Sequence, residues 1–251
     1  MHRFFINNEN IQDNKIIVIG EDVKHIKNVL RLTEGDTISL CDKQGTDYIV
    51  EICDLLKEKI ICSILETKLS STEPPIEVIL YQGVPKSTKM DLIIQKSTEL
   101  GVAKIVPVIT DRTIVKIQDR KKEEKKLERW NKITEEAAKQ SKRSLIPEVS
   151  EILTFEEMLI ALKNDGLTIV PYENEKNKGI KEVLKDKVCK KVNIIIGPEG
   201  GFEDKEIEAL QTIGSNIVSL GPRILRTETA GFITSAIVLY ELGDLGVSYN
   251  E

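Results

Sequence analysis

The chain has 251 residues, of which 40% are hydrophobic and 31% are charged, and its formal net charge at pH 7 is −5. This composition is typical of a soluble globular protein, and it excludes a polycation that binds nucleic acid through its overall charge. Any contact with nucleic acid must therefore depend on local basic patches.

Two further classes of protein are disfavoured by what the sequence lacks. No run approaches the ~18 to 20 apolar residues of a membrane span, and the first residues lack the apolar core of a signal peptide, so we expect a cytoplasmic protein without a membrane partner. The 4 cysteines form no C-x-x-C pair and there are only 2 histidines, so we expect reduced thiols and no metal site.

Residues 1–70 are predicted to form a small β-barrel domain with one helix. Short strands separated by turn residues are expected at 37–40, 47–53 and 59–65. The helix is expected at 22–31, because the apolar residues in that segment would share one face.

The segment 71–75 ends in two prolines and reads as a linker, and the hydrophobic pattern changes after it. Strands alternate with helices from 76 to 251, which is typical of a parallel sheet covered on both faces. The strands are expected at 76–81, 104–108, 168–172, 192–196 and 216–220. The helices are expected at 89–100, 123–140 and 228–242, with one short helix between the strands 192–196 and 216–220.

Two glycine-rich junctions near the C-terminus carry the strongest functional signal. The sequence Gly197-Pro198-Glu199-Gly200-Gly201 follows one predicted strand, and Gly221-Pro222 follows the next. If these strands are adjacent and parallel, both loops lie at the carboxyl edge of the sheet, where open α/β sheets bind ligands. Neither a P-loop nor a dinucleotide-binding glycine pattern is present at the places where such a motif would be expected.

A set of short motifs in one order extends over the whole chain. The junctions read G-P-E-G-G and L-G-x-R-I-L-R-x-E-T-A. The other segments are Arg3-Phe4-Phe5, His25 with Val29-Leu30-Arg31, Lys86 with Lys89-Met90-Asp91, Gln95-Lys96 with Thr98-Glu99-Leu100-Gly101, and Gln140-Ser141 with Arg143. This pattern resembles the SPOUT superfamily of knotted RNA methyltransferases, and within it the enzymes that methylate N3 of uracil in 16S rRNA. The resemblance implies an α/β fold whose C-terminal domain, 76–251, contains a deep trefoil knot, preceded by a PUA-like domain that positions RNA.

The resemblance also implies S-adenosyl-L-methionine as the cofactor, held mainly by backbone groups. The implied cofactor-binding residues are Tyr172, Gly197, Gly200, Gly201, Leu220, Gly221, Ile224, Leu225 and Ala230. Glycine allows the backbone to approach a ligand closely, and Ile224 and Leu225 could form apolar walls for the adenine. Core packing is the alternative for these two side chains.

Arg226 is the first candidate for catalysis. N3 of uracil is a weakly acidic imide, so methylation requires loss of its proton and stabilisation of negative charge on O2 and O4. A fixed guanidinium can meet that charge, because arginine stays protonated and offers forked donors. The alternative is a cap or salt bridge with Glu228 at the last helix. Glu228 or Glu199 could act as a base, although a carboxylate near helix N-termini is more readily an ionised, structural group.

The predicted partner is 16S rRNA, in an assembled small ribosomal subunit. Candidate RNA-binding residues are Arg3, His25, Arg31, Lys86, Lys89, Arg143 and Arg223. A solvated surface is the alternative for the lysines, and a surface or interface position is the alternative for His25.

The last predicted helix is apolar on more than one side, which implies burial on two sides. One side would cover the sheet, and the resemblance implies that the other forms a homodimer. Two other functions remain open: a non-catalytic RNA-binding protein of two modules, and an α/β enzyme that uses another nucleotide.

Overall fold

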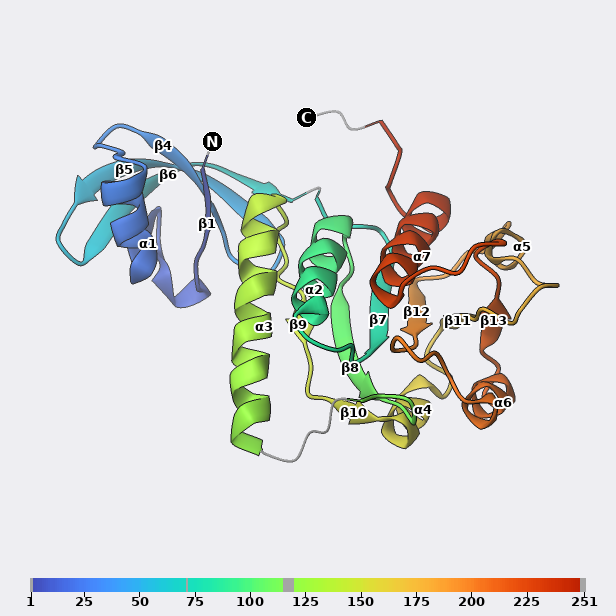
Figure 1. Cartoon of the computed structure of the whole chain (residues 1–251). Helices are drawn as coiled ribbons and strands as arrows, with labels where there is room; N and C mark the ends of the chain where they lie inside the picture. The colour runs from blue at the N-terminus through green and yellow to red at the C-terminus, as the bar shows by residue number, and fades with distance from the viewer. Residues whose placement is uncertain (1, 71, 115–119, 249–251) are drawn as a thin grey trace. The chain divides into compact units, whose positions relative to one another are not determined.

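The computed structural model describes residues 2–70, 72–114 and 120–248, and the chain divides into two compact units (Figure 1). Unit 1 comprises Met1–Glu73 and Ala138–Ile146, and unit 2 comprises Pro74–Ala137 and Pro147–Glu251. Ser71, in the predicted linker 71–75, lies outside the described residues.

Unit 1 is built on a six-stranded sheet with the order β1-β4-β5-β6-β3-β2. The strands are β1 (Arg3–Phe5), β2 (Ile11–Gln12), β3 (Lys15–Ile19), β4 (Thr37–Cys41), β5 (Thr46–Leu55) and β6 (Lys59–Leu69). β1 runs parallel to β4, and the other pairs are antiparallel. Alternate residues of these strands form the apolar core of the unit, with Ile38, Val50 and Ile60 fully buried.

The helix predicted at 22–31 is a short α-helix, α1 (Glu21–Lys24), followed by a π-helical turn at His25–Val29. Val23 and Ile26 are buried against the sheet, as their spacing predicted. A 3-10 turn at Asn8–Asn10 precedes β2.

The segment Ala138–Ile146 joins unit 1 through a buried ion pair. Arg143 Nη2 lies 2.6 Å from Glu73 Oε2, and the Arg143 side chain is 4% exposed. Glu73 also accepts hydrogen bonds from the backbone N–H groups of Ser144 and Leu145. This segment was expected to belong to the domain 76–251; the domain boundaries themselves stay a prediction.

Unit 2 contains a seven-stranded sheet in which every pair is parallel. Its order is β10-β8-β7-β12-β11-β13, with β9 also paired to β8. The strands are β7 (Glu77–Gly83), β8 (Lys104–Ile109), β9 (Glu148–Val149), β10 (Leu153–Thr154), β11 (Leu167–Pro171), β12 (Lys191–Ile196) and β13 (Asn216–Val218). The helices are α2 (Lys89–Leu100), α3 (Arg120–Gln140), α4 (Phe155–Leu162), α5 (Ile180–Leu184), α6 (Asp204–Thr212) and α7 (Thr227–Leu242).

Helices cover both faces of this sheet, as the alternation of strands and helices predicted (Figure 1). Val78 and Leu80 of β7 pack in the core formed with α2, α3, α5 and α7. Ile79 and Tyr81 pack on the opposite face with α4 and α6. A strand buried on both faces has no polar side, which explains the continuous apolar runs in the sequence.

Two features of unit 2 differ from the expectation. The helices α4 and α5 were not predicted, and β12 and β13 are not neighbours, because β11 lies between them and pairs with both.

None of the described helices has both the length and the apolarity needed to cross a membrane. The described side chains also contain no cluster of three or more His, Cys, Asp or Glu suited to a metal ion.

Candidate active site at the carboxyl edge of the parallel sheet

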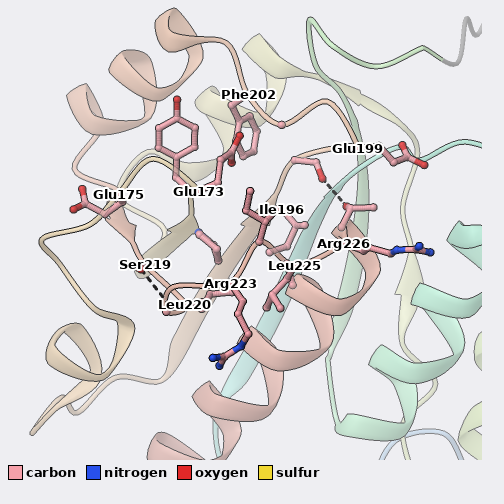
Figure 2. A pocket seen from close by; sticks show the side chains of 18 of the residues that line it. Glu173, Glu175, Ile196, Glu199, Phe202, Ser219, Leu220, Arg223, Leu225 and Arg226 are labelled. Carbon is pink, nitrogen blue, oxygen red and sulfur yellow. Dashed lines mark hydrogen bonds between the residues drawn. The ribbon is translucent and has the colours of Figure 1, made fainter.

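A cavity of about 970 Å³ lies at the carboxyl edge of the sheet of unit 2 (Figure 2). Its walls are three segments that follow the strands β11, β12 and β13, and residues at the start of α7 complete it. Although β12 and β13 are not adjacent, they flank β11, so all three segments leave the sheet at the same edge. This is the place where open α/β sheets bind ligands.

The cavity brings together most of the predicted cofactor-binding residues. Its lining includes Tyr172, Gly197, Gly201, Leu220, Gly221, Ile224, Leu225 and Ala230. Gly200 is not among the lining residues; its carbonyl oxygen accepts a 2.8 Å hydrogen bond from Arg112 Nη1 instead. Ile224 is 87% exposed, which excludes core packing for this side chain, whereas Leu225 is half-buried.

The glycine loop, residues 197–202, has its shape fixed by close backbone contacts. Gly201 has φ +70°, and a Cβ there would lie 2.7 Å from the Glu173 carboxylate. At Gly83, the last residue of β7, a Cβ would lie 2.5 Å from the Pro198 nitrogen. Backbone atoms of the loop therefore require glycine at Gly83, which had not been expected, whereas at Gly201 the positive φ favours glycine and the Glu173 carboxylate is the movable end of an exposed side chain.

An ion-pair cluster joins the start of α2 to both glycine-rich junctions. Lys89 Nζ lies 3.0 Å from Glu199 Oε1 and 3.6 Å from Glu228 Oε2. The Lys86 backbone N–H also donates to the Glu199 carboxylate. The hydrogen bond to Glu199 raises the pKa of Lys89 above its ordinary value. Lys89, predicted as an RNA ligand, is thus engaged by two carboxylates.

Glu199 is held in its ionised form. Burial raises the pKa of Glu199, but its own backbone N–H, the Lys89 ammonium and the Lys86 backbone N–H outweigh burial and lower the pKa below its ordinary value. This agrees with a structural role for Glu199 and disfavours a role as general base.

Arg226 is exposed and precedes the first residue of α7. In Figure 2 its side chain extends away from the side of the cavity where Glu173 and Glu175 lie. The ion pair of Glu228 is with Lys89, so the expected alternative of an Arg226–Glu228 salt bridge is not observed among the described residues. Arg223 also lines the cavity and is exposed.

Two of the predicted RNA-binding arginines, Arg3 and Arg143, are buried in ion pairs with carboxylates. Arg3 Nη2 lies 2.5 Å from Asp47 Oδ1, and the two side chains are 9% and 7% exposed. Arg143 is buried in its ion pair with Glu73. Buried, paired guanidinium groups cannot reach a phosphate without breaking these pairs, which argues against the predicted RNA contacts of both residues.

The other RNA-binding candidates in unit 1 remain accessible. His25 and Arg31 are exposed, and the His25 ring meets the Phe4 ring edge to face at 5.9 Å between centroids. In unit 2, Lys86 is exposed as well.

Sequence reasoning missed the acidic wall of the cavity. Glu173 and Glu175, which follow β11, line the cavity (Figure 2). Backbone N–H groups of Asn177 and Lys178 donate to Glu175 and lower its pKa, so Glu175 shapes the loop. Their position directly after a predicted buried strand was a signal that could have identified them.

Family models match both parts of the chain: an RNA methyltransferase PUA domain at residues 18–65 and an RNA methyltransferase domain at residues 72–239. The fold and the site therefore define an RNA methyltransferase with an N-terminal PUA-like domain, which confirms this part of the predicted fold.

Known relatives define the family more closely. The chain is 36% identical over 249 residues to ribosomal RNA small subunit methyltransferase E of Bacillus subtilis (strain 168), covering 96% of this chain and 97% of the relative. The protein of the same name from Mesomycoplasma hyopneumoniae (strain 232) is 33% identical, with 92% and 95% covered. The crystal structure of a ribosomal RNA small subunit methyltransferase E from Neisseria gonorrhoeae bound to S-adenosyl methionine superposes with a TM-score of 0.87 at 30% identity, covering 98% of this chain and 99% of that one. The chain belongs to the ribosomal RNA small subunit methyltransferase E family.

Proposed function

We propose that the protein uses S-adenosyl-L-methionine to methylate N3 of a uridine in 16S rRNA, with the RNA presented in an assembled small ribosomal subunit. The observation that carries the proposal is the cavity at the carboxyl edge, formed by the junctions that resemble the methyltransferase motifs. The relative from Neisseria gonorrhoeae, which has been crystallised with S-adenosyl methionine, supports the cofactor assignment.

The cavity has the size and chemistry that this cofactor needs. Its volume of about 970 Å³ suits a ligand of cofactor size. Ile196, Leu220 and Leu225 provide apolar surface for the adenine, and the carboxylates of Glu173 and Glu175 favour a positively charged ligand. We assign cofactor binding to the predicted lining residues and leave Gly200 outside this set.

Two residues of this chain are proposed to act on the uracil. S-adenosylmethionine supplies an electrophilic methyl group when it is bound. Arg226 would stabilise the negative charge that develops on O2 and O4 of the ring. Glu228 is the candidate base; its Oε2 is buried, with no hydrogen-bond partner among the described residues, and its nearest cation is Lys89.

RNA binding is proposed for the accessible basic residues only. These are His25, Arg31, Lys86 and Arg223. Lys89 is left out of this set because it is engaged in ion pairs. The PUA-like domain, predicted at 1–70, would position the RNA for the methyltransferase domain, predicted at 76–251. Local basic residues then replace the bulk charge that a net charge of −5 does not provide.

We also propose a trefoil knot in the C-terminal region. β13 lies at the edge of the sheet, yet α7 after it packs against β7 and β12 near the centre. The segment 219–226 must therefore cross back over the carboxyl edge, where the loops after β11 and β12 also lie.

A homodimer through α7 completes the proposal. Ile233 and Tyr240 on this helix are 41% and 69% exposed, and Val247 beyond it is 63% exposed. Light scattering should give about twice the mass of one chain, and Ile233→Glu should shift the protein toward the monomer by placing a charge in an apolar interface. A wild-type monomer with full activity would contradict the dimer.

The decisive experiment combines genetics with binding. A strain that lacks this protein should lose one N3-methyluridine from 16S rRNA by nucleoside mass spectrometry, and the purified protein with S-adenosylmethionine should restore it. Supplying free 16S rRNA and isolated small subunits in parallel identifies the form of the substrate. Calorimetry with S-adenosylmethionine separates a methyltransferase from a non-catalytic RNA-binding protein and from an enzyme of another nucleotide, since neither alternative binds this cofactor.

A further inference from the structure

A buried chain of hydrogen bonds connects three segments beneath the cavity. Gln82, near the end of β7, is fully buried, and its Nε2 donates to Thr227 Oγ1 at 2.9 Å. Thr227 Oγ1 in turn donates to the carbonyl oxygen of Gly197 at 2.6 Å. Neither Gln82 nor Thr227 has been given a role so far, although Thr227 lines the cavity.

The donors and acceptors available to Gln82, Thr227 and Gly197 determine the direction of each of these hydrogen bonds. Gln82 Nε2 also donates to the Gly83 carbonyl oxygen at 3.0 Å, so the amide nitrogen must face that way; a flipped amide would bring two carbonyl oxygens together. The Thr227 oxygen therefore accepts from Gln82, and its single proton is left for Gly197. The hydroxyl cannot satisfy both neighbours in any other rotamer.

The chain of bonds sets the distance between two walls of the cavity. Gly197 begins the glycine loop after β12, and Thr227 is the first residue of α7. Gly231, one turn later in α7, also lies beside Gln82: a Cβ built there would be in ordinary contact with Gln82 Oε1, at 3.5 Å. A buried hydrogen bond between loops restrains them more than an exposed one, because water cannot replace it.

We propose that Gln82 and Thr227 are positioning residues for methyl transfer: together they hold the glycine loop and the start of α7 at the spacing that the cofactor requires, and they fix the backbone from which Arg226 projects. This inference rests on the proposed function. Gln82 does not reach the cavity lining, so it acts only through Thr227.

The test compares the same substitution at two buried threonines of α7. Thr227→Val keeps the shape of the side chain and removes the hydroxyl, and Thr227→Ser keeps the hydroxyl. Thr234→Val is the matched control: Thr234 is fully buried, and its hydroxyl donates to the Ala230 carbonyl of its own helix at 2.7 Å. It does not line the cavity.

The expected pattern separates positioning from stability. Thr227→Val should weaken S-adenosylmethionine binding in calorimetry and slow single-turnover methylation, each by about tenfold, the effect of one buried hydrogen bond. Thr227→Ser should restore both to within about threefold, and Thr234→Val should lower the melting temperature while leaving both unchanged. If Thr227→Val does not fold, Gln82→Met should produce a smaller change of the same sign, because the Thr227 hydroxyl is then free to rotate.

Hydrogen exchange provides a readout that does not depend on the cofactor. Thr227→Val should speed amide exchange in the glycine loop, and Thr234→Val should not. Wild-type affinity and exchange in folded Thr227→Val, or equal effects of the two valine variants, would overturn the inference. If the wild-type protein binds no S-adenosylmethionine while Thr227→Val still loosens the loop, the proposed function fails and the loop connection stands.

Discussion

Replacing Gly83 with alanine tests how closely the glycine loop rests on β7. The added Cβ would lie 2.5 Å from the Pro198 nitrogen, 2.6 Å from its Cδ and 2.9 Å from the Gly197 carbonyl carbon. Carbon atoms in contact prefer a separation of about 3.5 to 4.0 Å, so the loop must move by roughly 1 Å. Over-packing of this kind costs about 1 to 3 kcal/mol, and we expect the free energy of unfolding to fall by about 2 kcal/mol. Because Gly197 and Pro198 line the cavity, cofactor affinity should fall as well.

The assay is urea unfolding with calorimetry on the same samples, and Gly231→Ala is the matched control. A Cβ at Gly231 would meet Gln82 Oε1 at 3.5 Å and Ile196 Cγ1 at 3.9 Å, which is ordinary contact. Glycine inside a helix is less stable than alanine by about 0.5 to 1 kcal/mol, so Gly231→Ala should be neutral or stabilising. A Gly83→Ala protein with the stability and affinity of wild type would refute the claim that backbone contact positions the loop.

Three further substitutions address catalysis, unit 1 and pH. Arg226→Ala should lower single-turnover methylation by ~10²- to 10³-fold with cofactor affinity nearly intact, and Arg226→Lys should rescue it in part; a near-normal rate in a stable Arg226→Ala protein would end the catalytic assignment. Glu73→Leu should lower the free energy of unfolding by about 3 kcal/mol, measured in urea, because the buried Arg143 loses its carboxylate; an unchanged midpoint would contradict this. The folded-state pKa of Glu199 is lowered, so its stabilisation is present above the unfolded pKa of about 4.3 and is lost as the pH falls through the folded value. The stability difference between wild type and Glu199→Gln should therefore shrink between pH 7 and acid; urea unfolding across that range measures it, and a constant difference would contradict the ionised role.

Much of unit 2 could be predicted because its signals are local. The apolar runs at β7, β8 and β12 and the helix α2, closed by Gly101 with φ +107°, lie within a residue or two of their predicted bounds. The helix α4 was missed although Thr154 and Glu157 form a capping box, a pattern that is visible in the sequence. α5, with 5 residues, is too short to show a period.

Non-local pairing explains what could not be predicted. β12 pairs with β7, more than a hundred residues earlier in the chain, and β11 lies between the two strands that lead into the glycine-rich junctions, β12 and β13. The same limit applies to Arg143, whose charge is visible in the sequence but whose partner, Glu73, lies 70 positions away. A basic residue was therefore assigned to RNA when it is buried in an ion pair.

The same contrast between local and non-local signals separates the site residues that could be predicted from those that could not. The glycine loop and the second junction, Gly221-Pro222, could be placed at one edge of a sheet because each follows a predicted strand. Gln82, near the end of β7, is connected to the glycine loop through Thr227, and no motif marks it in the sequence. Its role follows only from contacts made across the sheet.

These contacts bear on which arginine at the cavity is the better candidate for the proposed catalytic charge. Electrostatic catalysis requires a charge that is already in place when the transition state forms, since reorganisation would cost part of the gain. Arg223 lies between Pro222 and Ile224 in an exposed stretch of the segment after β13. Arg226 precedes Thr227, whose hydroxyl is held between Gln82 and Gly197. These buried hydrogen bonds of Thr227 restrain the backbone next to Arg226. Lys89, which also lines the cavity, is already opposed by two carboxylates. Preorganisation and available charge therefore both favour Arg226 over its neighbours.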